Sequence, residues 1–423
     1  MRKPKWFFLI AMLAIFALVG AACADDDGDG AGGDADTACS EDEFGCVEIA
    51  DGDPIVLGTL LVISGENAQL GQDSQNGVVL GADYIDGAFD GTAQLLGHDI
   101  EFEHQDEGCS AEGGQAGARA LVADIDRIVA VVGTSCSSAA LGVADQIFSD
   151  EGVVLISPSN TSPDLAGPDH QPFYFRTAHN DLIQGAEAAR FVTEELGLTK
   201  AATIHDGSTY ADGLQGAFAD AFQSEFGGEI TAQEAVQVGQ KDMKPVLTQI
   251  AGTGPEFLFY PVFIPEGGAI TAQAREVAEL EGVELGGADG MLSPDFVEAA
   301  GGDNAEGVYL SGPDLEFAGG FYQDEFLPAY EDQFGDTTSV FHAHSFDAAQ
   351  IVLKAIEEVA IDEGGTLFIP RTALRDAIQN TEGYAGIVGE LTCDENGDCN
   401  PGASMSVSQV TNGEFETVWR SSE

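Results

Sequence analysis

Positively charged side chains are scarce in this sequence. Its 423 residues contain 15 Lys and Arg against 73 Asp and Glu, which gives a formal net charge of −58. A surface of this kind repels phosphate groups, so nucleic-acid binding is excluded as the function. Electrostatic attachment to anionic lipid headgroups is excluded for the same reason. The charge balance fits an exported protein but carries no information about the fold.

Sequence motifs of several enzyme classes are also missing. No GxxxxGK[ST] loop for ATP phosphates occurs, and no GxSxG elbow surrounds a serine. A hydrolase built from Ser137 and the pair His205-Asp206 is the remaining enzyme candidate, and a structural role for that pair is the favoured interpretation. We therefore expect no catalytic residue, no metal and no cofactor.

A long apolar run occurs at the N-terminus. Three basic residues precede the apolar segment from Trp6 to Val19, which is typical of a secretory signal and short for a membrane span. The small residues Gly20–Ala22 directly before Cys23 resemble a bacterial lipobox, although Gly20 replaces the usual Leu. We predict a signal peptide at residues 1–22 and a lipid on Cys23. An ordinary signal peptide cut nearby, or an uncleaved anchor, is the alternative.

An acidic segment follows the predicted signal. Residues 25–36 read DDDGDGAGGDAD, and a stretch of such low hydrophobicity and high charge cannot bury a core. We expect a flexible tether with a small disulfide loop over residues 23–53. A Ca²⁺-binding loop is the alternative, but the EF-hand spacing and its terminal Glu are absent.

Six cysteines remain after Cys23, an even number in an exported protein. Two pairs of cysteines are close in sequence, Cys39 with Cys46 and Cys393 with Cys399. The second pair flanks an Asn-Gly turn signal. The last two cysteines each follow an apolar strand. A zinc site is the alternative, but neither a CxxC pair nor an HxxxH motif accompanies them. We predict three structural disulfides, namely Cys39–Cys46, Cys109–Cys136 and Cys393–Cys399.

Apolar strands alternate with helical segments from Ile55 onward, and the pattern restarts after Arg176. Such alternation predicts parallel, doubly wound sheets, here in two Rossmann-like lobes. A long helical region with two or three helices is expected over residues 321–380, and a β segment over residues 387–419. Ligands of such sheets bind beyond the carboxyl ends of the strands. The side chains that follow predicted strands are Ser64, Ser137, Ser159, Thr161, Tyr210, Phe263 and Asp289.

A series of short motifs from residue 54 to the end resembles one known family. The motifs of this series include Asp106-Glu107-Gly108-Cys109, Gly133 to Ser138, Ser157 to Pro163, Asp181 with Gln184-Gly185, and Gly287 to Gly290. Their order and spacing resemble the Leu/Ile/Val-type solute-binding proteins of ABC importers. The resemblance implies an α/β, type I periplasmic-binding-protein fold, with two lobes, three crossovers and a ligand cleft between them. It also implies a disulfide between Cys109 and Cys136.

The resemblance further implies the limits of the two lobes. Lobe 1 is expected to comprise residues 54–178 and 313–387. Lobe 2 is expected to comprise residues 179–312 and 388–423.

The carboxylate-binding segment is implied by the same resemblance. Ser137, with Ser138 beside it, stands where relatives hold a ligand α-carboxylate, and Thr161 assists. Hydroxyl and free N–H groups at a helix start suit an anion. The alternative is that Ser137 only caps its helix.

The other site residues are also assigned by resemblance. The carbonyl of Ser159 and the carboxylate of Asp289 stand where relatives receive the ligand ammonium, and Tyr210 resembles the aromatic residue that closes over the ligand. A solvated acid and a surface aromatic are the respective alternatives. Leu70 and Phe263 occupy positions where relatives often have Tyr. Both changes make the pocket less polar and favour an apolar ligand side chain.

The function implied by the resemblance is capture of an amino acid, branched-chain or otherwise apolar, by closure of two lobes. The partner is the membrane permease of an ABC transporter. Because this sequence has no phosphate-binding loop for ATP, a separate subunit of the transporter is expected to hydrolyse ATP. The expected location is outside the cytoplasm, with membrane contact through the N-terminal lipid only. The alternative is a sensor of the same fold for amides, urea or aromatic compounds.

Overall fold

A computed structural model of the chain describes residues 35–167, 171–316 and 320–421. The predicted signal peptide, Cys23 and residues 24–34 of the predicted tether lie outside these residues. Residues 35–53 of that tether are described and fold with the rest of the chain, because Val47 and Ile49 are buried in its hydrophobic core. Among the described helices, none combines the length and the apolar character that crossing a membrane requires.

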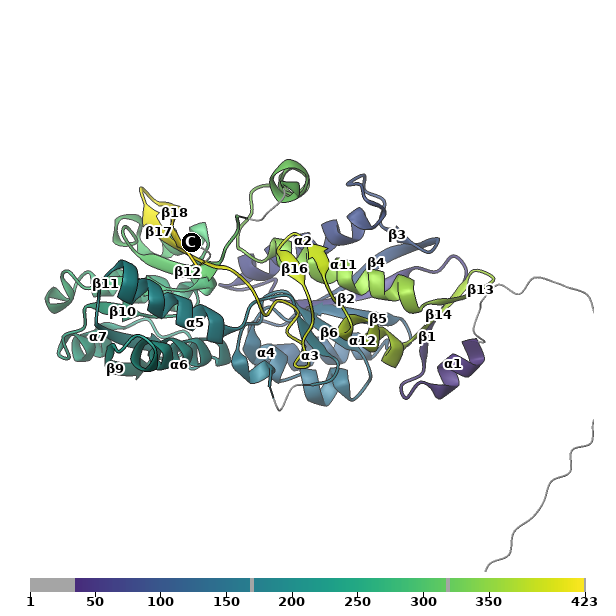
Figure 1. The fold of residues 1–423 in the computed structure, drawn as a ribbon, viewed down its shortest axis with the longest axis horizontal. Helices are drawn as coiled ribbons and strands as arrows, with labels where there is room; N and C mark the ends of the chain where they lie inside the picture. Colours follow the sequence, from purple (N-terminus) through teal and green to yellow (C-terminus); the bar gives the residue numbers. More distant parts are fainter. Residues whose placement is uncertain (1–34, 168–170, 317–319, 422–423) are drawn as a thin grey trace, which may run out of the picture. The chain divides into compact units, whose positions relative to one another are not determined.

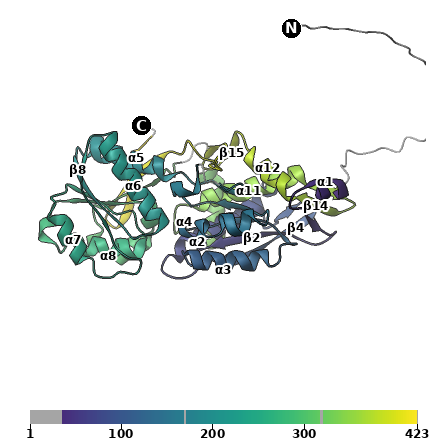
Figure 2. The same ribbon diagram turned by 90° about the horizontal axis from the view of Figure 1, so that it is seen from below.

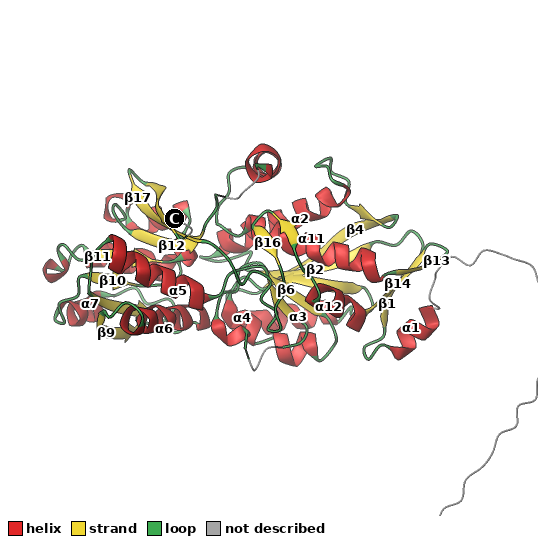
Figure 3. Ribbon diagram, viewed as in Figure 1, coloured by secondary structure: helices red, strands yellow, loops and turns green. Residues whose placement is uncertain are grey.

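The first large sheet has six strands and is mainly parallel (Figures 1 and 3). Across the sheet the order is β3 (Gln94–Leu95), β4 (His98–Asp106), β2 (Ile55–Leu61), β5 (Ile128–Gly133), β6 (Val154–Ser157) and β7 (Tyr174–Arg176). Only β3 is antiparallel to its neighbour.

Helices cover both faces of this sheet (Figure 2). Ile55 and Leu57 of β2 pack in one cluster, with α2 (Ala68–Asp83), α11 (His342–Val359) and α12 (Arg371–Gln379). Val56 and Leu60 pack in the opposite cluster, with α3 (Ala111–Val122) and α4 (Ser137–Leu141). Since both faces are covered, β2 is buried along its whole length and is largely apolar rather than alternating, with Thr59 as its one polar side chain.

The second large sheet has seven strands. Its order is β18 (Glu414–Arg420), β17 (Met405–Thr411), β12 (Tyr309–Pro313), β11 (Glu284–Gly287), β10 (Phe257–Phe259), β8 (Lys200–His205) and β9 (Glu229–Ala235). The strands from β12 to β9 are parallel, whereas the late strands β17 and β18, yellow in Figure 1, extend the sheet as an antiparallel hairpin beside β12. The helices of this part are α5 (Asp181–Arg190), α6 (Thr209–Ser224), α7 (Lys244–Ala251), α8 (Ile264–Ala274) and α9 (Pro294–Ala300).

The chain passes three times between the two sheets. The passages lie between β7 and α5, between β12 and α10 (Leu327–Phe334), and between the hairpin β15 (Tyr384–Gly386)–β16 (Gly389–Leu391) and β17. The predicted lobe limits remain a prediction. Because Leu391, Cys393 and Cys399 pack in the hydrophobic cluster of the first sheet, we propose that the third passage follows Cys399.

The region predicted as helical over residues 321–380 also contains two strands. After α10 and α11, β13 (Ile361–Glu363) and β14 (Thr366–Pro370) precede α12. Strand β14 pairs on its other side with β1 (Cys46–Ile49), which follows α1 (Ala35–Glu41). The helical prediction was wrong for the part from β13 to β14, which forms a local hairpin, and β1, more than 300 residues away in sequence, adds a third strand to it.

All three predicted disulfides are formed. The bonds are Cys39–Cys46, Cys109–Cys136 and Cys393–Cys399, with sequence separations of 7, 27 and 6 residues. A disulfide restricts the unfolded chain more when the loop it closes is longer.

Loop length therefore ranks the effects of removing these bonds. Replacing Cys109 and Cys136 together by alanine should lower the free energy of unfolding by about 3–4 kcal/mol, against about 2 kcal/mol for the matched double variant at Cys393 and Cys399. The melting temperatures of the two variants, measured side by side with the wild type, test the ranking. An equal or reversed order would contradict it.

Candidate functional site

A small cavity lies where the carboxyl ends of strands from both sheets meet. Its volume is about 10 Å³, room for about one water molecule. The residues around it are Leu70, Ser135, Cys136, Ser137, Ser159, Tyr210, Phe263, Asp289, Gly290 and Phe341. These residues follow β5, β6, β10 and β11 or begin helices beside them, as expected for a ligand site in open α/β sheets.

The structure brings together six of the eight ligand residues predicted from sequence. Leu70, Ser137, Ser159, Tyr210, Phe263 and Asp289 line the cavity. Ser138 and Thr161 do not. The Ser138 hydroxyl instead accepts the amide of Thr209 at 3.1 Å, while Thr161 is fully buried and does not line the cavity. Their roles toward a ligand remain predictions.

Four lining residues were not predicted from the sequence. Ser135, Cys136 and Gly290 adjoin predicted positions, so the strand-end rule came within two residues of each. Phe341 has no such signal, because it precedes α11 rather than following a strand.

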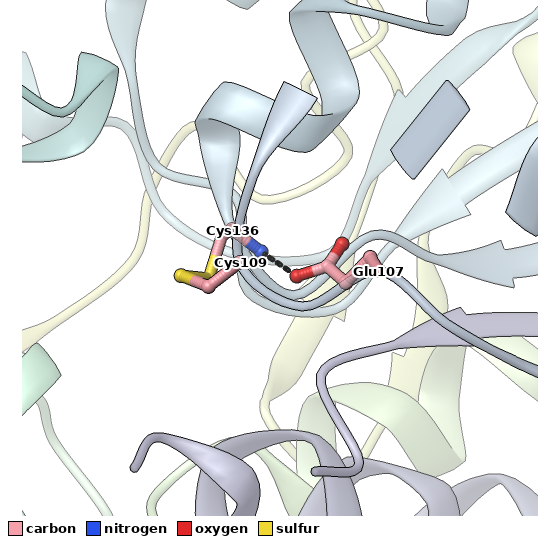
Figure 4. Close-up of side chains that lie close together, drawn as sticks. All are labelled: Glu107, Cys109 and Cys136. Atoms are coloured by element: carbon pink, nitrogen blue, oxygen red, sulfur yellow. Dashed lines mark hydrogen bonds between the residues drawn. A yellow bond between two sulfur atoms is a disulfide. The ribbon is translucent and has the colours of Figure 1, made fainter. Parts of the chain in front are cut away.

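A buried carboxylate holds the segment that carries Ser137. Glu107 accepts the amide of Ser135 at 3.1 Å and the amide of Cys136 at 2.8 Å, and Figure 4 shows the second of these bonds. Burial raises the pKa of Glu107 well above its usual range, and these two amides oppose the shift. Glu107 thus fixes the backbone on one side of the cavity, next to the disulfide that joins Cys136 to Cys109.

Glu107, Cys109 and Cys136 also have the spacing of a three-ligand metal group, since one ligand atom from each lies within 4.8 Å of the others. Figure 4 shows the two sulfur atoms bonded to one another. Cysteine binds a metal as the thiolate. The oxidised pair offers no thiolate, so in this form the donor set does not fit a metal.

The turn after β5 requires glycine. Gly133 has φ +149°, and a Cβ there would lie 2.2 Å from the carbonyl oxygen of Leu60. Beyond it, the Ser159 hydroxyl donates to the carbonyl of Ser135 at 3.1 Å, and the Ser137 hydroxyl accepts the amide of Ser162 at 3.4 Å. Helix α4, which starts at Ser137, has only five residues, so hydroxyls and local amides rather than a long helix dipole face the cavity.

The opposite side of the cavity carries a buried acid. Asp289 accepts hydrogen bonds from the Gln184 amide at 2.7 Å and from the Tyr210 hydroxyl at 3.1 Å, and that hydroxyl accepts the amide of Gly290 at 3.2 Å. Burial raises the pKa of Asp289, while His179, Gln184 and Tyr210 oppose the shift. Gln184 also lies 2.6 Å from His179 through its carbonyl oxygen, so it connects the two groups.

The remaining walls are apolar. Leu70 comes from α2, Phe341 precedes α11, and Phe263 precedes α8. The rings of Phe263 and Tyr210 lie 5.2 Å apart between centroids. The cavity therefore combines a buried acid, a segment of hydroxyl and amide groups, and an apolar surface.

The enzyme candidate does not assemble in the same way. His205 Nδ1 lies 3.3 Å from Asp212, whereas Asp206 accepts the amide of Ser208 at 2.8 Å. Within residues 35–167, 171–316 and 320–421, no hydrogen bond joins the Ser137 hydroxyl to a histidine.

Comparisons with known proteins cover most of the chain. Residues 54–414 match the periplasmic binding protein family. The leucine-, isoleucine-, valine-, threonine- and alanine-binding protein of Pseudomonas aeruginosa is 26% identical over 300 residues, 70% of this chain and 76% of that protein. The Leu/Ile/Val-binding protein of Escherichia coli K12 is 27% identical over 274 residues, 64% and 71% of the two chains. A branched-chain amino acid transporter substrate-binding protein of Streptococcus pneumoniae, solved with isoleucine, has a TM-score of 0.73 at 25% identity, covering 86% of this chain and 99% of that one.

Proposed function

Because the chain belongs to the periplasmic binding protein family, whose members bind solutes outside the cytoplasm, we propose that it captures an L-amino acid with an apolar side chain. The observation that carries this proposal is the cavity, in which the buried acid Asp289 faces the hydroxyl and amide groups around Ser137. The names of the relatives from Pseudomonas aeruginosa and Escherichia coli, which refer to aliphatic amino acids, support it. The type I fold predicted from the sequence is confirmed.

An amino acid enters such a site as a zwitterion, and both of its charges lose water. Each charge then requires an opposite charge or fixed dipoles, because an unpaired buried charge is strongly unfavourable. We assign the ammonium to Asp289 and the carbonyl of Ser159. The carboxylate is assigned to the segment at Ser137, and the side chain to Leu70 and Phe341.

Admission of this ligand requires the two sheets to move apart. A cavity of about 10 Å³ is far below the pockets of roughly 300–1,000 Å³ that enclose drug-sized ligands. Contacts between the two parts include the Ser138–Thr209 hydrogen bond and an exposed ion pair of Lys241 with Glu66 at 3.6 Å. Hinge motion that breaks such contacts opens binding proteins of two lobes.

We propose delivery of the captured solute to the membrane permease of an ABC transporter. The sequence lacks a phosphate-binding loop for ATP, so energy from ATP would be supplied by a separate subunit. We assign no catalytic step to the chain. Incubation with amino acid amides and esters should leave them unchanged, whereas their turnover by the purified protein would contradict this assignment.

Anchoring through Cys23 is a further part of the proposal. The small residues before Cys23 and the acidic segment after it support a lipid-bearing N-terminus followed by a tether. Cys23→Ser should abolish incorporation of labelled fatty acid and release the protein into the medium. Wild-type protein that carries no lipid would contradict the anchor without affecting the binding proposal.

A thermal-shift screen tests the ligand class. A ligand that binds only the folded state raises the melting temperature in proportion to the logarithm of its excess over the dissociation constant. The twenty L-amino acids, together with amides, urea and benzoate, form the screen. We expect the largest increases for leucine, isoleucine or valine. A response confined to urea, an amide or benzoate would favour the alternative ligand class instead.

A further inference from the structure

Asp181, which begins α5, is a buried acid that none of the roles above uses. Its side chain is fully buried, and neither carboxylate oxygen has a hydrogen-bond partner within the described residues. The main chain is fixed, because the amide of Asp181 donates to the carbonyl of Thr161 at 2.9 Å. The Thr161 hydroxyl faces the carboxylate and lowers its pKa, although the two groups lack the geometry of a hydrogen bond. A buried ion without partners is strongly unfavourable, so the state of this group requires an explanation.

The charged and titratable groups around Asp181 come from several elements. Three of them interact with Asp181 itself, namely Asp289 after β11, Arg176 at the end of β7 and Tyr210 on α6. A fourth, His179 before α5, interacts with Asp289. Burial first, and then Asp289, raise the pKa of Asp181 well above its usual range. Burial lowers the pKa of His179, which favours its neutral form.

The only cation in this group is already paired. Arg176 Nε donates to Asp398 at 2.5 Å, and a second guanidinium nitrogen donates to the same carboxylate at 2.9 Å. Its third nitrogen donates to the carbonyls of Asn160 and Ser162. Within the described residues, the electrostatically coupled pair Asp181 and Asp289 therefore has no cation of its own.

Two neighbouring buried carboxylates do not both ionise unless a cation joins them. Asp289 has two donors, the Gln184 amide and the Tyr210 hydroxyl, whereas Asp181 has none. The ionised form is thus better supported at Asp289, and the proton belongs on Asp181. The cavity adjoins Asp289 and Tyr210, so an ammonium group that enters it arrives beside this pair.

We propose that Asp181 is a specificity-determining residue that holds a proton in the ligand-free site and releases it to solvent when a ligand ammonium binds beside Asp289. The proposal rests on the proposed amino-acid function. No bond to the ligand forms, and one O–H proton leaves for each ammonium that enters. A ligand without a cationic nitrogen does not drive this exchange and is bound less well.

The exchange fixes the sign of the pH dependence. The pKa of Asp181 is higher in the ligand-free protein than in the complex, where the ammonium stabilises the carboxylate. Between these two values the complex holds fewer protons, so affinity rises with pH, by about tenfold per pH unit for one proton. Above and below this window the affinity no longer depends on Asp181.

Calorimetric titration of the whole chain with L-leucine measures the exchange directly. At each pH from 5 to 8, the titration is repeated in at least two buffers that titrate near that pH and differ in ionisation enthalpy, so that the buffer takes up the released proton. The dependence of the observed heat on the ionisation enthalpy then counts the protons released. We expect a release approaching one proton within the window for the wild type and for Glu298→Gln, an exposed acid, and a release near zero for Asp181→Asn. With 4-methyl-2-oxopentanoate, which lacks the amino group, no release is expected. Binding of L-leucine by the wild type without proton release at any of these pH values would overturn the proposal and leave the proposed function intact.

The melting temperature of the ligand-free protein provides a second readout. A buried acid whose folded pKa is raised binds its proton more tightly in the folded state, so its contribution to stability is lost as the pH rises from the unfolded value of about 3.9. The melting temperature of Asp181→Asn relative to the wild type should therefore be higher at pH 8 than at pH 4. A difference that does not change with pH would overturn the proposal. Failure of every L-amino acid to bind would contradict the proposed function, and this readout would still decide the state of Asp181.

Discussion

Replacing Asp289 by alanine is expected to weaken binding of an apolar L-amino acid by about 2–5 kcal/mol, or roughly 30- to 5,000-fold. The reason is that the ligand ammonium would lose its carboxylate partner inside a closed cavity, where water does not compensate. Calorimetric titration of the variant with the ligand found by thermal shift measures this loss of affinity. The loss should appear in affinity while the melting temperature of the free protein changes little or rises, because the pKa of the buried Asp289 is raised in the folded state.

Two matched variants make this result specific. Asp295→Ala removes an exposed acid in the following helix and should leave affinity unchanged. Ser137→Ala should weaken binding by roughly 1–3 kcal/mol, less than Asp289→Ala, because neighbouring amides still face the ligand carboxylate. A variant at Asp289 that binds as tightly as the wild type would contradict the assignment of the ammonium.

Replacing Arg176 by methionine should lower the free energy of unfolding by about 3–5 kcal/mol. Arg176 is fully buried, and Asp398, its partner in two hydrogen bonds, comes from the segment that leads to the third passage between the sheets. Burial alone would lower the pKa of Arg176, but the Asp398 carboxylate holds that pKa above its usual value. Removal of the guanidinium leaves Asp398 as a buried charge bonded only to the Asn180 side chain.

Melting temperature measures this effect, with an expected fall of about 5 °C for a chain of this size. The double variant Arg176→Met with Asp398→Asn should recover part of the loss, since it removes the unpaired charge as well as the cation. Lys244→Met is the surface comparison, because Lys244 forms an ion pair with Glu276 at 2.6 Å with both side chains exposed, and no resolvable change is expected. A double variant less stable than Arg176→Met would contradict the argument.

The sequence was sufficient for the features that depend on local pattern. Strands such as β2 and β5 were predicted because a strand buried on both faces is a nearly continuous apolar run. The strand-end rule located Ser137 and Asp289, since the carboxyl ends of parallel strands meet at one edge of a sheet.

Features that depend on distant partners were not predictable in this way. The pairing of β14 with β1, at the other end of the chain, could not be read from the local sequence, although β14 also forms a hairpin with the neighbouring β13. Phe341 reaches the cavity from the start of α11, and its sequence context carries no strand-end signal. Glu107 and Gln184 belong to motifs that were recognised in the sequence, but their roles required the structure. Glu107 binds the amides of Ser135 and Cys136, and Gln184 donates a hydrogen bond to Asp289.

The proposal that a zwitterionic amino acid is held between the two sheets is tested most directly by comparing L-leucine with N-acetyl-L-leucine in calorimetric titrations of the wild-type protein. The two ligands share the side chain and the carboxylate, and only the first carries an ammonium for Asp289. The account predicts saturable one-to-one binding of L-leucine and binding of the acetylated ligand that is at least roughly 100-fold weaker. Equal affinity for the two ligands, or no binding of L-leucine, isoleucine or valine, would contradict it.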